Sequence, residues 1–196
     1  LPGFAVRDGG DMELRVSRCQ RKNLSLFREN ATENVSRRRA YAGTNAALPP
    51  PGPGHSARTS EGKTMPPFQT IPDLLAQGAP AHPAIRAPGR PPLDHAGLRT
   101  LAERTVASLN RIGIGRGDRV AIVLPNGPEA AAAFVAIAAG ATTAPLNPAY
   151  REDEFAFYME DLRARALVAL KGAETPARAA AARLGIPVLD LVPGAA

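Results

Sequence analysis

The segment "GIGRGD", residues 113–118, places glycines at alternate positions, a spacing found in loops that bind the pyrophosphate of a dinucleotide. Such a loop must follow a strand and open a helix, because its N–H groups and the helix dipole then meet the phosphates. In this chain an amphipathic pattern precedes the glycines, and the aliphatic run "RVAIVL" follows them. Since this order is reversed, the segment is interpreted as a helix C-terminus followed by a turn.

The strand-to-helix corner of this region is instead "PNGP", residues 125–128. A helix that starts here could bind an anion through its free N–H groups. Pro128, however, removes one of these N–H groups, and Glu129 adds a negative charge, so both residues weaken an anion site. Capping by Asn126 or Gly127 accounts for the corner without a ligand.

Three consecutive carboxylates, Glu152, Asp153 and Glu154, are residue types that perform acid–base chemistry or hold a metal ion. They also fall in the first turn of a predicted helix, where negative charge stabilises the helix dipole. Arg163 and Arg165 suit the last turn of the same helix, where positive charge is favoured. The pattern therefore favours a structural role over a catalytic one.

Histidine and cysteine show no arrangement that performs catalysis or binds a metal. His55, His82 and His95 lack the spacing of metal ligands, and Cys19 has no second cysteine with which to form an internal disulfide. Asp94 stands next to His95, but neighbours in sequence point in different directions and need not pair. Because no nucleophile constellation is visible, we predict no catalytic, cofactor-binding or metal-binding residue in this chain.

Charge and hydropathy argue against two classes of partner. The formal net charge of +6 comes mainly from residues 1–64, which carry 11 Lys and Arg against 6 Asp and Glu, a net of +5. Residues 65–196 carry 13 against 12, a net of +1. Without interleaved aromatic residues, the basic segment does not predict nucleic-acid binding. The longest apolar run, Ala130–Ala141, has 12 residues, fewer than the roughly 20 that cross a bilayer, so no membrane span is predicted.

Residues 1–64 also differ in pattern from the rest of the chain. They show no sustained helical or strand period, and "ALPPPGPGHSARTSEGKT", residues 47–64, is typical of a linker. Although "EGKT" ends like a phosphate-binding loop, that motif requires a glycine at the position of Ala57. We therefore predict a disordered basic extension over 1–64 and a folded unit over 65–196, with Met65 as the hypothetical biological start. No charged-then-apolar signal peptide opens the chain, so a cytoplasmic setting is expected.

From Met65 onward, segments of helical and strand period alternate. The stretch "GLRTLAERTVASLNRIGI" places apolar residues three and four positions apart, which predicts an amphipathic helix with Asp94 or a neighbour near its start. The alanine-rich segment 129–140 predicts a helix that is apolar on nearly every side and that other elements should cover. Further helices are expected where Phe155, Tyr158, Met159 and Leu162 recur and over 174–184, and strands are expected over 119–124, 142–146, 166–170 and 186–192. This alternation predicts an α/β fold, with a parallel sheet and flanking helices.

The segment "LNRIGIGRGDRVAIVLPNGPEAAAAFVAIAAGATTAPLNPAYREDEFAFYMEDLRARALV", residues 109–168, resembles the start of the AMP-forming acyl-CoA synthetases, within the adenylate-forming enzymes. The shared pattern is a Gly-Asp-x-Val turn into a strand, a Pro-Asn corner, a small-residue helix that ends in Ala-Gly-Ala, and Pro-Leu-Asn-Pro. The resemblance extends over about residues 70–194, and "ATTAPLNPAYREDEFAFYMEDL" is similar to the branch that contains the oxalate-CoA ligases. The matching residues are Gly117, Asp118, Val120, Pro125, Asn126, Gly140, Pro145, Leu146, Asn147 and Pro148.

The resemblance implies the incomplete N-terminal part of the large domain of a ligase that uses ATP, CoA and Mg²⁺ to activate a small carboxylic acid, with oxalate favoured. The chain differs at Asp94-His95, where the family usually has Thr-Tyr. The family's phosphate loop that ends in Pro-Lys, its Tyr-Gly-Thr-Thr-Glu-like segment, its ribose-binding aspartate and its catalytic lysine would all lie beyond residue 196. The chain alone is therefore expected to bind none of these cofactors and to be inactive. A fatty-acid or aryl-acid ligase and a non-catalytic α/β interaction module stay open as alternatives.

Overall fold

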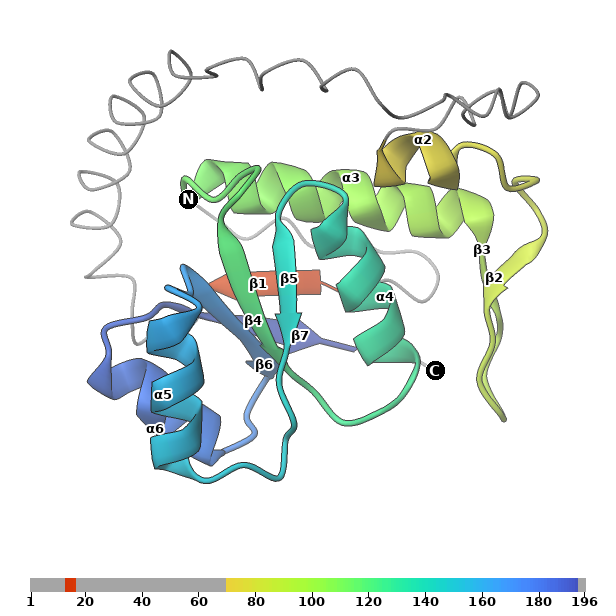
Figure 1. Ribbon diagram of the computed structural model, residues 1–196. Coiled ribbons are helices and arrows are strands. Elements are labelled where there is room, and N and C mark those ends of the chain that lie inside the picture. Colours follow the sequence, from red (N-terminus) through yellow and green to blue (C-terminus); the bar gives the residue numbers. More distant parts are fainter. Residues whose placement is uncertain (1–12, 17–69, 194–196) are drawn as a thin grey trace, which may run out of the picture.

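A five-stranded sheet forms the centre of the computed structural model of this protein, which describes residues 13–16 and 70–193 (Figure 1). The sheet has the order β1-β7-β6-β4-β5. The four strands β4 to β7 are parallel, and β1 pairs antiparallel with β7. The predicted α/β fold with a parallel sheet is confirmed. The strands are β1 (Glu13–Val16), β4 (Arg119–Val123), β5 (Thr142–Pro145), β6 (Ala166–Leu170) and β7 (Val188–Val192).

Helices α3 and α4 cover one face of this sheet, and α5 and α6 cover the other (Figure 1). The chain runs from β4 through α4 to β5, then passes back through α5 to β6 on the opposite side of β4. Because parallel crossovers are right-handed, this change of direction moves the connecting helix to the other face. The helices are α2 (Ile71–Leu75), α3 (His95–Arg111), α4 (Pro128–Ala138), α5 (Glu152–Asp161) and α6 (Pro176–Arg183).

The predicted helices and strands from residue 94 onward are all present, with their ends shifted by a few residues. Asp94 caps the start of α3, because its side chain accepts a hydrogen bond from the Gly97 N–H at 2.7 Å. The short helix α2 and the hairpin of β2 (Pro83–Ile85) and β3 (Leu93–Asp94) were not predicted. Both elements are too short to produce a clear hydrophobic period.

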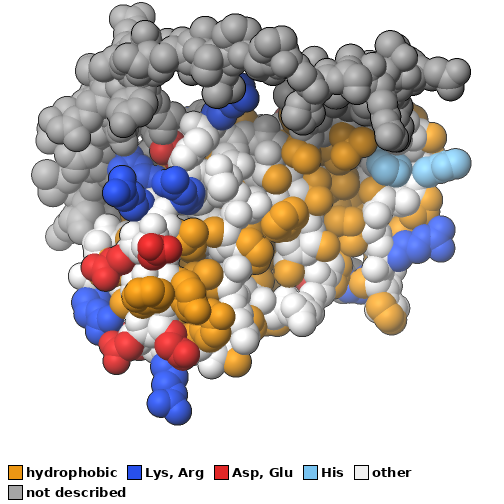
Figure 2. Space-filling model, viewed as in Figure 1, with side chains coloured by type: hydrophobic (Ala, Val, Ile, Leu, Met, Phe, Trp, Pro, Cys, Tyr) orange, Lys and Arg blue, Asp and Glu red, His pale blue; other side chains and the backbone are white. Residues whose placement is uncertain are grey.

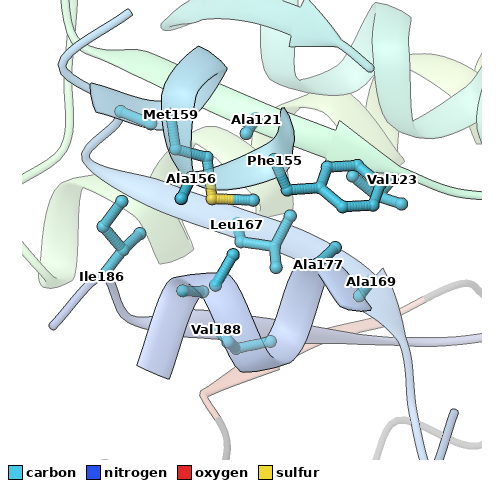
Figure 3. Close-up of a cluster of buried hydrophobic side chains, with 13 residues drawn as sticks. Ala121, Val123, Phe155, Ala156, Met159, Leu167, Ala169, Ala177, Ile186 and Val188 are labelled. Atoms are coloured by element: carbon cyan, nitrogen blue, oxygen red, sulfur yellow. The ribbon is translucent and has the colours of Figure 1, made fainter. Parts of the chain in front are cut away.

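Successive side chains of each strand point to opposite faces of the sheet, so the hydrophobic core has one part on each face. In β4, Val120 and Ile122 face α3 and α4, whereas Ala121 and Val123 face α5 and α6. Figure 3 shows the second of these cores, in which Phe155 and Met159 of α5 lie over Leu167 of β6. A third cluster joins α3 and α4 to the β2–β3 hairpin. Within residues 70–193 no helix is both long and apolar enough to cross a membrane.

The strand β1 lies within residues 1–64, where the sequence shows no sustained helical or strand period. Glu13–Val16 pairs with β7 over four register positions, from Glu13 opposite Val192 to Val16 opposite Leu189. A four-residue strand has almost no local signal, and its stability comes from hydrogen bonds to a strand that is distant in sequence. The predictions for Cys19, His55, Ala57 and Met65 lie outside the described residues.

The expectation that α4 is covered on nearly every side is wrong for one stripe of the helix. Ala132, Ala133 and Ala136 are buried, but Phe134 is 43% exposed, and Ala131 is also exposed. The alanine-rich composition hid this asymmetry, because small side chains are compatible with both a buried and an exposed face.

The C-terminus of α5 differs from the prediction that Arg163 and Arg165 lie in its last turn. The helix ends at Asp161, with Leu162 as its C-cap, and Arg163 follows in the left-handed region with φ 49°. Its N–H donates to the Glu160 carbonyl at 2.8 Å, and the next N–H, of Ala164, donates to the Met159 carbonyl at 2.9 Å. This is a Schellman motif, which usually has glycine where this chain has Arg163.

Replacing Arg163 by glycine is expected to raise the free energy of unfolding by about 0.5–1 kcal/mol, because glycine adopts a positive φ without Cβ strain. The gain is partly offset by the greater freedom of glycine in the unfolded chain. Urea denaturation of the 196-residue chain measures the difference. Arg163→Ala keeps the Cβ and serves as the control, and an Arg163→Gly chain no more stable than Arg163→Ala would contradict the strain argument.

Candidate functional site

The glycine segment forms the predicted helix C-terminus and turn. The Gly113 N–H donates to the Asn110 carbonyl, and the Ile114 N–H donates to the Leu109 carbonyl, both at 3.0 Å, with Gly113 at φ 78°. A tight turn follows, in which the Asp118 N–H donates to the Gly115 carbonyl at 2.9 Å. These N–H groups are therefore used within the protein, and the segment leads into the amino end of β4.

Asp118 is the polar side chain that holds this turn. It is only 6% exposed, and its carboxylate accepts a hydrogen bond from the Gly115 N–H at 2.8 Å. Its backbone carbonyl accepts a second bond, from the Thr142 N–H of β5 at 2.8 Å. The Gly-Asp motif thus sets the position at which β4 and β5 begin to pair.

Asp118→Ala is expected to lower the free energy of unfolding by about 1–2 kcal/mol, because it leaves the part-buried Gly115 N–H without its acceptor. Asp118→Asn keeps an oxygen acceptor and is expected to lose less. Chemical denaturation of the three chains at one pH measures both differences. Equal losses in the two variants would show that the charge, and not the hydrogen bond to the turn, carries the effect.

The "PNGP" corner lies at the carboxyl end of β4 and starts α4. Gly127 is the N-cap, and no side chain caps the helix, so Gly127 and not Asn126 takes the predicted capping position. Pro128 occupies the first turn of the helix, as predicted. Arg90, from the loop between β2 and β3, forms an ion pair with Glu129. The hydrogen bond from Arg90 is the main cause that lowers the pKa of Glu129 below its ordinary value. Because the Glu129 carboxylate is negatively charged, it disfavours the binding of another anion at this corner.

The strand order places this carboxyl end of β4 at a switch point of the sheet. The strands β4 and β6 are neighbours, and their connections leave toward opposite faces of the sheet. At such a switch point, ligands bind beyond the carboxyl ends of the strands. Asn126 follows β4 there and Lys171 follows β6, and both residues are exposed. These two residues mark the switch point, which sequence reasoning missed because only the strand order defines it.

The three carboxylates of the "REDEF" segment lie in the first turn of α5, as predicted. Arg183 of α6 pairs with Glu152 at 3.2 Å and with Asp153 at 3.1 Å. Glu154 accepts a hydrogen bond from the Arg151 N–H at 2.8 Å. These carboxylates connect α5 to α6 and cap α5. Within the described part of the chain, no group of three His, Cys, Asp or Glu residues could hold a metal ion.

Asp94 and His95 do not form a catalytic pair. The Asp94 carboxylate caps α3, while the His95 ring packs against Gly78, where a Cβ would lie 2.2 Å from Nδ1. Arg99 fixes the same region, because its guanidinium donates to the carbonyls of Leu75 at 3.1 Å and Gly78 at 3.0 Å. The departure from the family pattern at these two positions therefore has a structural role at the α2–α3 junction.

An aromatic group on α5 is a surface feature that sequence reasoning also missed. Tyr150 stacks on Tyr158 with ring centroids 5.1 Å apart, and Phe157 meets Tyr158 edge to face at 5.4 Å. A hydrogen bond with Tyr158 is the main cause that raises the pKa of Tyr150. Phe157 is 63% exposed, and Figure 2 shows hydrophobic side chains flanked by acidic ones over α5. The spacing of Tyr150 and Tyr158, one before the helix and one two turns into it, was the available signal.

Comparison with known proteins identifies the family whose sequence pattern this chain shares. The family model described as "AMP-binding enzyme" matches residues 75–192. The oxalate–CoA ligase of Arabidopsis thaliana is 40% identical over 114 residues, which cover 57% of this chain and 22% of that protein. The long-chain-fatty-acid–CoA ligase FadD13 of Mycobacterium tuberculosis is 31% identical over 100 residues, which cover 48% of this chain and 20% of that protein. This chain therefore spans about a fifth of the length of these relatives.

Solved structures also match this chain. The crystal structure of apo MatB from Rhodopseudomonas palustris superposes with a TM-score of 0.54 at 27% identity, over 61% of this chain and 24% of that one. The residues that the family model matches, 75–192, include the four parallel strands and helices α3 to α6.

Proposed function

Because this chain belongs to the AMP-binding enzyme family, we propose that residues 70–193 are a structural part of an AMP-forming acid–CoA ligase. The match over residues 75–192 is the observation that supports this proposal. It includes the Gly-Asp turn, the Pro-Asn corner and the "PLNP" segment, which together build β4, α4 and β5.

The reaction follows from the chemistry of carboxylic acids. A carboxylate resists attack by a thiol because its oxygen is a poor leaving group. Transfer of the carboxylate to the α-phosphate of ATP forms an acyl-adenylate and releases pyrophosphate, and the thiol of CoA then displaces AMP. Mg²⁺ offsets the phosphate charge when it is bound. In this proposal ATP, CoA and Mg²⁺ are held by other parts of a longer ligase, and residues 70–193 supply the sheet.

The contacts of the polar residues support the proposal that residues 70–193 supply the sheet and do not hold ATP, CoA or Mg²⁺. In the glycine segment, the N–H groups of Gly113, Ile114, Gly115 and Asp118 all bond within the protein. The corner before α4 carries the Arg90–Glu129 pair, and the α5 carboxylates bond to Arg183 and to the Arg151 N–H. No catalytic, cofactor-binding or metal-binding residue is therefore proposed within residues 70–193, and the 196-residue chain by itself is proposed to be inactive.

ATP–pyrophosphate exchange tests the inactivity directly. We expect the purified 196-residue chain to give no exchange above a protein-free blank with oxalate, a long-chain fatty acid or an aryl acid. An active full-length acid–CoA ligase is the positive control. Exchange by the 196-residue chain at a rate comparable to that control would overturn this part of the proposal.

Sequencing the native transcript through codon 196 tests the larger claim. We expect the reading frame to continue into a Ser/Thr/Gly-rich loop that ends in Pro-Lys. A stop codon directly after Ala196, together with a chain that unfolds cooperatively, would instead favour a non-catalytic α/β interaction module. The cytoplasmic setting expected for the protein stays a prediction that cell fractionation can test.

Oxalate is the substrate we propose for the longer ligase. The similarity to the oxalate–CoA ligase of Arabidopsis thaliana supports it, at 40% identity against 31% for the fatty-acid ligase. Acid-dependent release of AMP by the longer protein, measured with oxalate, fatty acids and aryl acids, is expected to favour oxalate. Preference for a fatty or aryl acid would overturn the choice of substrate and leave the reaction type unchanged.

A further inference from the structure

The two edges of the sheet differ in what they offer to another strand. At the β5 edge, the Thr142 N–H donates to the Asp118 carbonyl at 2.8 Å, and the Leu146 N–H donates to the Ile122 carbonyl at 2.9 Å. Since backbone groups alternate in direction along a strand, those of Thr143 and Pro145 face away from β4. Proline has no N–H, so this edge lacks a donor at one of its two outward positions. The β5 edge is poorly suited to strand addition.

The β7 edge has no such defect. The Leu167 N–H donates to the Pro187 carbonyl at 2.9 Å, and the Lys171 N–H donates to the Leu191 carbonyl at 3.0 Å. The residues that alternate with these, Val188, Asp190 and Val192, therefore direct their backbone groups away from β6. Each of the three has both an N–H and a carbonyl. This is the edge at which β1 pairs.

The register of β1 matches the outward-directed backbone groups of β7. Arg15 stands opposite Asp190, so these two residues occupy a position where an antiparallel pair exchanges both of its hydrogen bonds. Leu14 stands opposite Leu191, which is fully buried on the α3–α4 side of the sheet.

The charge at the edge also restricts the incoming strand. Asp190 is held by Arg178 of α6 at 2.6 Å, and the side chains of the pair are 14% and 15% exposed. The same Arg178 nitrogen donates to the Leu170 carbonyl at 2.6 Å. A strand that placed an acid opposite Asp190 would bring a second negative charge to this half-buried pair, whereas β1 places Arg15 there.

We propose that the outer edge of β7 is a strand-acceptor site that residues 13–16 occupy within the same chain, and that it takes the same strand when it is offered as a separate peptide. The matching ligand is an extended antiparallel segment with apolar residues opposite Leu189 and Leu191 and a basic residue opposite Asp190. This interaction is independent of ligase chemistry. It gives residues 13–16 a role that a chain starting at Met65 would lack.

Amide hydrogen exchange on the full 196-residue chain tests the pairing. The N–H groups of Asp190 and Val192 are expected to exchange about tenfold or more slowly in the unmodified chain than in Arg15→Pro, which loses a donor into β7. Leu14→Pro is the matched control, because the Leu14 N–H faces away from β7 and its loss should have a smaller effect. The Leu189 N–H, which faces β6, is the internal reference and should stay protected in all three chains.

Peptide binding tests the acceptor site itself. A peptide of residues 11–18 is expected to bind the Arg15→Pro chain and to restore protection at Asp190 and Val192, whereas the same peptide N-methylated at Arg15 should not. N-methylation at Leu14 leaves every side chain intact and should permit binding. Unprotected Asp190 and Val192 in the unmodified chain beside a protected Leu189 would overturn the proposal. Dimerisation of Arg15→Pro that the peptide fails to reverse would assign the edge to a second copy instead.

Discussion

Replacing Phe155 with alanine is expected to lower the free energy of unfolding by about 3–5 kcal/mol, the largest effect of any single truncation proposed for this protein. Phe155 is 0% exposed and lies in the core between α5, α6 and the sheet, beside Val123 (Figure 3). Its ring also meets Tyr150 edge to face, with centroids 5.8 Å apart. Truncation removes these contacts. It also leaves a cavity, because α5, α6 and the sheet are held in place by their other contacts and cannot move in to fill the space.

Phe157 provides the matched control on the same helix. It is 63% exposed, so Phe157→Ala is expected to change the free energy of unfolding by no more than about 0.5 kcal/mol. Urea denaturation followed by far-ultraviolet circular dichroism measures both variants of the 196-residue chain. Similar losses in the two variants would contradict the placement of Phe155 inside the core and Phe157 outside it.

Replacing Gly140 with alanine is expected to lower the free energy of unfolding by about 1–3 kcal/mol through overpacking. Gly140 follows α4, and a Cβ at this position would lie 2.7 Å from Cγ2 and 2.8 Å from Cγ1 of Val106 on α3. Valine is branched at Cβ and has few rotamers, so its side chain cannot turn away freely. The two helices would have to move apart, which disturbs the third hydrophobic cluster between them.

A double-mutant cycle separates this clash from other effects of losing a glycine. Val106→Ala removes both methyl groups and is expected to cost about 1 kcal/mol by itself. In the chain that carries both substitutions, the cost of Gly140→Ala should fall by about 1 kcal/mol or more, since the two closest atoms are gone and only the Cβ of residue 106, 3.2 Å away, stays near the added methyl group. Additive effects of the two substitutions would exclude the contact as the cause, and the unfolding midpoints of the four chains in urea decide between the outcomes.

Prediction from the sequence succeeded where the signal was local. The helices around Leu98, Phe155 and Ala180 and the strands β4 to β7 lie where hydrophobic period and turn residues placed them. The glycine segment that follows α3 also marked the C-terminus of that helix correctly. The end of α5 was predicted too far along the chain, because Arg163 adopts a positive φ that is typical of glycine and rare for arginine.

For the residues whose types could perform chemistry, local roles were also predictable and long-range partners were not. The glycine turn and the first-turn carboxylates have the structural roles that their order along the chain indicated. Their partners could not be predicted, because Arg90 approaches Glu129, and Arg183 approaches Glu152, across long separations in sequence. Asp94 and His95 were not predicted to pair from their adjacency, and the structure gives them separate roles, in the cap of α3 and in the contact with Gly78.

By itself the sequence determined the elements of this protein, its α/β class and its resemblance to the adenylate-forming enzymes, because helical and strand periods and short motifs are encoded by neighbouring residues. The tertiary structure alone decided that Phe134 is exposed, that Asn126 and Lys171 mark a switch point, and that Glu13–Val16 closes one edge of the sheet. Strand order and edge pairing depend on hydrogen bonds between segments far apart in the chain, and no local pattern specifies which strand lies next to which.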